Sequence, residues 1–217
     1  MKSRDSILQC VRDAVTKHPH VAPPPVPEVW PLENPTPAAM AERFTKELTE
    51  VHGEVIRCAT MEEARKRLAE LVEQAEWTSL GGMDRTTVRE ATADLAPGLI
   101  EWAVDGWQPQ RMADLSASVI ESDVLLADTG SCLIACATAE DRLLCYLPPA
   151  CVVIARADQL TEHLPAAWAT IAPRVADPAL RGEFVIVTGP SRTADIEKVL
   201  VSPAHGPATV HLAVYES

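Results

Sequence analysis

The chain has 217 residues, a hydrophobic fraction of 47% and a formal net charge of −12. This length is sufficient for one domain with a sizeable core. The aromatic content of 4% means that this core must be built mainly from aliphatic side chains. Acidic and basic residues are mixed along the chain, which argues against nucleic acid or an anionic membrane surface as the main partner. Any anionic ligand must therefore be bound locally.

The sequence predicts a cytoplasmic protein without a membrane span. No apolar run approaches the roughly 20 residues that cross a bilayer, and no signal peptide opens the chain. Six cysteines are scattered among aliphatic residues, without a CxxC motif, a histidine pair at zinc spacing or an iron–sulfur run. We expect these cysteines to be core residues, with no structural disulfide, no metal site and no cofactor on this chain.

Residues 1–37 are predicted to form a helix followed by a proline-rich arm. Apolar residues recur at helical spacing over 3–17. Residues 18–37 contain eight prolines, which neither continue a helix nor join the middle of a sheet. From residue 38 to residue 217, helical and strand-like segments alternate, and this pattern predicts one α/β domain.

In chain order, that domain is expected to open with a helix at 38–51, a strand at 54–58 and a helix that starts with a capping box at Thr60–Glu63. There follow a strand at 77–80, a turn at Gly81–Gly82, a helix with a second capping box at 87–90, a strand at 99–104 and a short helix or turn at 111–117. Short apolar runs then predict consecutive strands, some of them hairpin partners, at 122–127, 131–136, 142–147 and 151–155. A helix near 159–172 and strands at 184–187 and 209–214 complete the prediction.

A polar cluster, TGPSRTADIEKVL at 188–200, directly follows the predicted strand 184–187. Open α/β sheets bind ligands at the carboxyl ends of their strands. Glycine allows backbone N–H groups to approach an anion, and Arg192 can clamp a carboxylate or phosphate through two hydrogen bonds. The alternative is a loop braced internally, with Arg192 paired to Asp195 or Glu197. The residues alone leave both interpretations open.

Two shorter motifs are weaker signals. Asp128-Thr129-Gly130-Ser131 lies between two apolar runs, where a hairpin turn is the favoured interpretation. An aspartic protease would need a second carboxylate sharing the proton, and no second copy of the motif exists. His205 lies in a proline-flanked turn, where it is either incidental or an acid–base or anion-binding group.

The order and spacing of ADTGS (127–131), DRLLCYLPPACVVI (141–154), TGPSRTADIEKVL and HGP (205–207) resemble those of the LUD-domain family, in its lactate utilization protein C group. The resemblance implies an α/β three-layer sandwich with a mostly parallel central sheet, like the ribose-phosphate isomerase and CoA-transferase superfamily. It also implies a role in oxidising L-lactate to pyruvate alongside partner proteins that carry the iron–sulfur clusters.

The resemblance also supplies candidate site residues. Asp128 and His205 are the candidate catalytic residues. The candidate ligand-binding residues share the same motifs and are Thr129, Gly130, Ser131, Gly189, Ser191, Arg192, Thr193, Asp195 and Gly206. On this interpretation the chain is a non-redox subunit of an L-lactate dehydrogenase complex that binds a small anion. The alternatives are a non-catalytic assembly module for iron–sulfur partners and a stand-alone isomerase or CoA-transferase-like enzyme.

Overall fold

The computed structural model describes residues 3–17, 30–104, 106–175, 183–191 and 206–216. The chain divides into two compact units, Met1–Pro31 and Leu32–Ser217. The first unit contains helix α1 (Ser3–Lys17), as the apolar spacing predicts. Its apolar side chains Ile7, Leu8, Val11 and Val15 are exposed.

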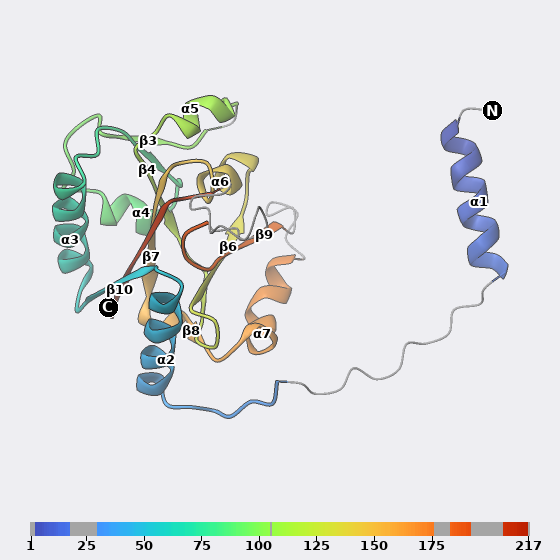
Figure 1. Ribbon diagram of the computed structural model, residues 1–217, viewed down its shortest axis with the longest axis horizontal. Helices are drawn as coiled ribbons and strands as arrows, with labels where there is room; N and C mark the ends of the chain where they lie inside the picture. The colour runs from blue at the N-terminus through green and yellow to red at the C-terminus, as the bar shows by residue number, and fades with distance from the viewer. Residues whose placement is uncertain (1–2, 18–29, 105, 176–182, 192–205, 217) are drawn as a thin grey trace, which may run out of the picture. The chain divides into compact units, whose positions relative to one another are not determined.

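A six-stranded parallel sheet forms the centre of the second unit (Figure 1). Its spatial order is β1-β10-β7-β4-β2-β3, and every neighbouring pair is parallel. The strands are β1 (Glu54–Cys58), β2 (Leu80–Gly82), β3 (Ile100–Trp102), β4 (Ala117–Glu121), β7 (Ala150–Arg156) and β10 (Thr209–Tyr215). The middle strand β7 is a nearly continuous buried apolar run, as expected of a parallel strand that is covered on both faces. The predicted α/β fold with a parallel central sheet is confirmed.

Helices α3 and α4 cover one face of this sheet, and α2, α6 and a second, smaller sheet lie on the other (Figure 1). The helices of this unit are α2 (Pro37–Glu50), α3 (Met61–Gln74), α4 (Thr86–Ala91), α5 (Pro109–Ala113), α6 (Ala139–Leu144) and α7 (Leu164–Val175), with a 3-10 turn at Ala157–Gln159. Helix α3 begins as predicted, because the Thr60 hydroxyl accepts the N–H of Glu63 at 3.2 Å. The Glu63 carboxylate accepts the N–H of Ala59 rather than that of Thr60.

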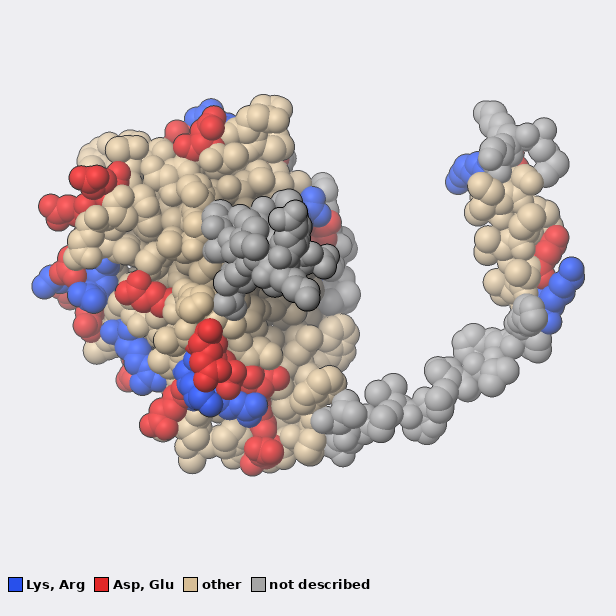
Figure 2. All heavy atoms as spheres, in the orientation of Figure 1, with Lys and Arg blue, Asp and Glu red and all other residues tan. Residues whose placement is uncertain are grey.

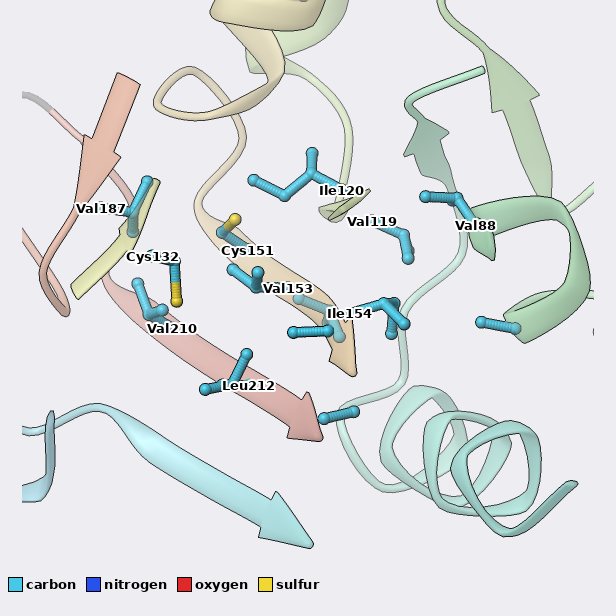
Figure 3. Packing of buried hydrophobic residues seen from close by; sticks show 14 of the residues in the cluster. Val88, Val119, Ile120, Cys132, Cys151, Val153, Ile154, Val187, Val210 and Leu212 are labelled. Atoms are coloured by element: carbon cyan, nitrogen blue, oxygen red, sulfur yellow. The ribbon is translucent and has the colours of Figure 1, made fainter. Parts of the chain in front are cut away.

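The smaller sheet has the order β8-β5-β6-β9 and carries the DTGS turn. Its strands are β5 (Val124–Leu126), β6 (Ser131–Cys136), β8 (Leu160–Thr161) and β9 (Glu183–Val187). Strands β5 and β6 form the expected antiparallel hairpin. One face of this sheet packs against the central sheet, where Cys132 and Val187 lie near Cys151 and Val210 (Figure 3). Helix α7 covers the other face through Ala167 and Ile171.

Three sequence-based expectations for this unit are wrong. The run 142–147 is not a strand: helix α6 occupies Ala139–Leu144, and Thr138 and Asp141 form its capping box. A short apolar run fits either period, and here the cap decides in favour of a helix. The helix predicted from residue 159 starts only at Leu164, after β8. Strand β9 belongs to the smaller, mainly antiparallel sheet, so the rule for carboxyl edges of parallel sheets does not apply to the loop that follows it.

The expected turn at Gly81–Gly82 and the second capping box are also wrong. Both glycines lie in strand β2. Glycine is needed there for close packing, since a Cβ atom at Gly81 would approach Leu115 to 2.7 Å and one at Gly82 would approach Trp102 to 2.7 Å. Helix α4 begins at Thr86 without a side-chain cap. The Thr87 hydroxyl is therefore free to donate to Glu121 at 2.8 Å.

On the face drawn in Figure 2, acidic and basic side chains are interspersed rather than segregated. This agrees with the mixed charges along the sequence. Among the described residues, no helix is both long enough and apolar enough to cross a membrane.

Candidate functional site

A chain of hydroxyl groups joins the DTGS turn to the start of the TGPSRT segment. Ser131 Oγ donates to Thr129 Oγ1 at 2.8 Å, and Thr129 Oγ1 donates to Asp128 Oδ1 at 3.2 Å. Ser131 Oγ also lies 2.7 Å from Thr188 Oγ1. A hydroxyl has a single hydrogen, so Thr188 donates to Ser131 when Ser131 donates to Thr129. All three hydroxyls then donate in the direction of the Asp128 carboxylate.

Strand register brings these residues together. Leu126 pairs with Ser131 across the hairpin, and Cys132 pairs with Val187 across β6 and β9. The next position along β9 is Thr188, which therefore lies beside Ser131. Ser131 is 2% exposed, whereas Asp128 is half-buried and Thr129 is exposed. The hydroxyl chain thus runs from the interior to the protein surface.

The end of helix α2 explains two of the motif glycines. Gly130 has φ of +62°, and a Cβ atom there would lie 2.3 Å from the backbone nitrogen of Leu48. Gly189 has φ of +79°, and its Cβ atom would lie 2.8 Å from Val51 Cγ2. Both positions require glycine for backbone conformation and for space. The last turn of α2 therefore packs against both motif loops.

The TGPSRT and HGP motifs also meet. The N–H of Ser191 donates to the carbonyl of Pro207 at 2.9 Å, and a Cβ atom at Gly206 would lie 3.1 Å from Ser191 Cβ. On the other side, the N–H of Ala208 donates to the Pro149 carbonyl at 2.7 Å. The segments before and after residues 192–205 are thus held together.

Among the predicted site residues, the structure therefore joins Asp128, Thr129, Gly130 and Ser131 to Thr188, and Ser191 to Gly206. Arg192, Thr193, Asp195 and His205 lie outside the described residues, as does the alternative pairing of Arg192 with Asp195 or Glu197.

Sequence reasoning missed two buried residues next to the DTGS turn, Glu162 and His163. The N–H of Asp128 donates to the Glu162 carbonyl at 3.1 Å, which extends the pairing of β5 with β8. The Glu162 carboxylate accepts the N–H groups of Glu33 and Asn34 at 2.8 and 3.2 Å, and so fixes the segment that leads into α2. Neither residue stands in a recognisable motif, and both lie inside the helix that the sequence predicts near 159–172. The sequence pattern therefore does not mark them as site residues.

A second polar cluster links the two sheets and was also missed. The buried carboxylate of Asp123 accepts Arg85 Nη1 at 3.1 Å and the N–H of Ala135 at 2.6 Å, and it pairs with Arg174. Arg85 lies 3.7 Å from Glu121 and also donates to the Ala135 carbonyl. Two arginines and two carboxylates balance in charge. With every oxygen of Asp123 bonded, the cluster is a brace between β4, β6 and α7.

A cavity of about 340 Å³ lies between α2, β1 and the inner face of the smaller sheet. Its walls are largely apolar, with Phe44, Val55 and Leu125 among them, and Arg57 and Glu216 are its charged groups. None of the predicted site residues lines it. The DTGS turn and this cavity are therefore separate features of the second unit.

The five buried cysteines are Cys58, Cys132, Cys136, Cys145 and Cys151, and all are free. Burial raises the pKa of the Cys151 thiol to about 11 and raises the pKa of Cys132 further. These groups are thiols at neutral pH and behave as core residues, as the sequence predicts. Within the described ranges, no group of three or more His, Cys, Asp or Glu side chains is arranged to hold a metal ion.

These features define an α/β protein whose polar motif loops gather at one end of a small second sheet. The family model of the LUD domain matches residues 41–215, and the chain belongs to the LUD-domain family. The resemblance noted from the motifs is thereby confirmed.

Two curated relatives are both named lactate utilization protein C, one from Bacillus licheniformis and one from Bacillus pumilus. Each is 30% identical to this chain, over 108 and 115 residues respectively. The matched regions cover 49% of this chain and 45% and 48% of the two relatives. The match thus spans about half the length of these relatives.

Among solved structures, a DUF162 family protein from Deinococcus radiodurans superimposes with a TM-score of 0.60 at 14% sequence identity. The superposition covers 85% of this chain and 99% of that chain. At this identity the likeness concerns the fold alone.

Proposed function

We propose that this protein takes part in lactate utilization and binds a small carboxylate at the DTGS turn. The two relatives named lactate utilization protein C support the metabolic role. The contact that carries the ligand proposal is the Ser131–Thr188 hydrogen bond, since it joins the DTGS turn to the TGPSRT segment. Because the three hydroxyl hydrogens are donated within the chain, the DTGS turn offers a small polar ligand acceptor oxygens, chiefly those of the Asp128 carboxylate, and the donors must come from other groups.

In this proposal Arg192 supplies the positive charge. The described part of the hydroxyl chain contains no cation, and it ends on the Asp128 carboxylate. A guanidinium that follows Ser191 by one residue would clamp the ligand's carboxylate through paired N–H groups, as arginine does with carboxylates generally. Electron transfer is assigned to iron–sulfur clusters on partner proteins, because this sequence has no cysteine run of the spacing that holds such clusters.

Calorimetric titration with L-lactate and with pyruvate tests the ligand proposal. The wild-type chain should bind at least one of them saturably, and Arg192→Ala should weaken that binding about tenfold or more. Arg67→Ala is the matched control, since Arg67 forms an exposed ion pair with Glu70 on α3. Equal affinities for wild type and Arg192→Ala, or no binding of either acid, would contradict the proposal.

A second candidate role, assembly with iron–sulfur partners, is favoured by helix α1. Its apolar side chains Ile7, Val11 and Val15 lie on a single helix, which cannot bury its own apolar face, so they require a surface outside their own unit. Deletion of residues 1–31 should abolish co-purification with co-expressed iron–sulfur partners. The deletion must stop there, because Glu33 and Asn34 bond to Glu162 in the second unit. Normal complex formation by the truncated chain would exclude this role for α1.

A further inference from the structure

His163 is a buried histidine with one unused hydrogen-bonding group. It is 4% exposed and directly precedes helix α7. Its Nδ1 atom accepts the N–H of Ala166 at 3.0 Å, as a side chain does when it caps a helix. Its Nε2 atom is buried, and no described residue forms a hydrogen bond to it.

The cap determines where the imidazole proton resides. Because Nδ1 accepts a hydrogen bond, it has no hydrogen of its own, and the neutral ring must carry its hydrogen on Nε2. Nε2 is therefore a donor and not a metal ligand in this arrangement. Buried donors are nearly always satisfied in folded proteins, so an orphan N–H calls for an acceptor that none of the described residues supplies.

His163 lies next to the DTGS turn. The N–H of Asp128 donates to the Glu162 carbonyl, which belongs to the peptide bond that joins Glu162 to His163. The Asp128 side chain accepts the Thr129 hydroxyl on Oδ1, and its carboxylate is partly exposed. A buried donor without a partner and a partly exposed carboxylate thus belong to two segments that are paired through their backbones.

This pair matches the chemistry of a 2-hydroxycarboxylate. Such a molecule has a hydroxyl hydrogen to donate and several oxygen atoms that accept, whereas a 2-oxo acid has acceptors only. A carboxylate such as Asp128 accepts hydrogen bonds and repels another carboxylate, so the hydroxyl group of the ligand is its suitable neighbour. The neutral N–H of His163 suits an oxygen of the ligand's carboxylate.

We propose that His163 is a ligand-binding residue whose Nε2–H donates to a small 2-hydroxycarboxylate held beside Asp128. The inference rests on the proposed function, since it presumes that the DTGS turn binds a carboxylate. It adds a residue that the motifs do not contain, and it predicts that the hydroxy acid binds more tightly than the oxo acid of the same carbon skeleton.

The test compares L-lactate and pyruvate binding by the full chain and by His163→Ser. Serine retains an acceptor for the first turn of α7 and removes the imidazole N–H, so the variant should remain folded. We expect L-lactate binding to weaken about tenfold or more and the preference for L-lactate over pyruvate to shrink. His52→Ser, at an exposed histidine in the loop after α2, serves as the control and should leave both affinities unchanged.

Nitrogen-15 spectra of histidine-labelled wild-type protein provide a second readout that does not depend on the variant's folding. The His163 ring should show the neutral form protonated on Nε2, and L-lactate should shift the Nε2–H resonance. Unchanged L-lactate affinity in His163→Ser, or an Nε2–H resonance unmoved by saturating L-lactate, would overturn the inference and leave the proposed function standing. Absence of L-lactate and pyruvate binding by the wild-type chain would overturn both.

Discussion

The hydroxyl oxygens of Ser131 and Thr188 lie 2.7 Å apart, although 57 positions separate them in the chain. This contact is the physical link between the DTGS turn and the TGPSRT segment. It depends on the antiparallel pairing of β6 with β9, which places the two residues at neighbouring ends of these strands.

A double-mutant cycle measures this link. Ser131→Ala leaves the Thr188 hydroxyl and the Thr129 oxygen without their buried partner, and we expect a loss of about 1–2 kcal/mol in the free energy of unfolding. Thr188→Val should cost about 1 kcal/mol. Because both changes remove the same bond, the double variant should lose less than the sum by at least about 0.5 kcal/mol. Additive losses in urea denaturation would show that the two hydroxyls are not coupled.

Gly130→Ala should destabilise the protein by about 3 kcal/mol. A positive φ costs an alanine about 1–2 kcal/mol, and the Cβ atom would also displace the backbone of α2 at Leu48. Gly98 is the matched control, since its φ is +82° and an added Cβ atom would meet nothing within 4 Å. Gly98→Ala should therefore show the backbone cost alone. Equal losses for the two variants would contradict the packing of α2 against the DTGS turn.

Asp123→Asn should lower the free energy of unfolding by about 3 kcal/mol, because it takes the buried carboxylate from Arg174 and leaves Arg85 only the more distant Glu121 at 3.7 Å. Asp84→Asn removes an exposed ion pair with Arg89 and should cost about 1 kcal/mol or less. Thermal and urea denaturation compare the two variants. A loss at Asp123 no larger than that at Asp84 would mean that the cluster does not brace the two sheets.

The buried cysteines predict how the native protein reacts with thiol reagents at pH 8. The thiolate is the reactive form, and burial raises the pKa of Cys58, Cys132 and Cys151 above the ordinary value of 9.0. Exposed Cys10 should react at once, and the five buried cysteines only as fast as the protein unfolds. Prompt reaction of Cys132 or Cys151, located by mass spectrometry, would contradict this burial.

The same shifts set a direction for stability at alkaline pH. The folded-state pKa of Cys151 is about 11 and lies above the unfolded value of 9.0, so the unfolded chain loses its proton first as the pH rises. Stability from this group is fully present below pH 9 and declines between about pH 9 and 11. Cys151→Ala should flatten this decline in the pH dependence of unfolding, and an unchanged slope would argue against the shift.

Part of the parallel core could be predicted, because β1, β7 and β10 are apolar segments bounded by helices or turns, whereas the sequence pattern predicts no strand at β4. Strand β1 and the hairpin of β5 and β6 follow directly from such runs and their turn residues. Helix α6 could not be predicted from its apolar residues, because DRLLCYL fits a strand as well as one face of a helix. The capping box of Thr138 and Asp141 decides in favour of the helix.

The candidate site was only partly predictable for a related reason. Motifs identified Asp128 and Ser131, but a motif does not reveal which distant segment lies beside it. Glu162 and His163 reach the DTGS turn through the pairing of β5 with β8, a strand of two residues that has no signature of its own. The antiparallel pairing of β9 with β6 places β9 in the smaller sheet, which no local pattern specifies.

The most direct test of this account is a crystal structure of the full chain with bound L-lactate. We expect the lactate to lie within hydrogen-bond distance of the Asp128 carboxylate and of His163 Nε2. Lactate bound instead in the apolar cavity lined by Phe44 and Val55, with the DTGS turn unoccupied, would contradict it.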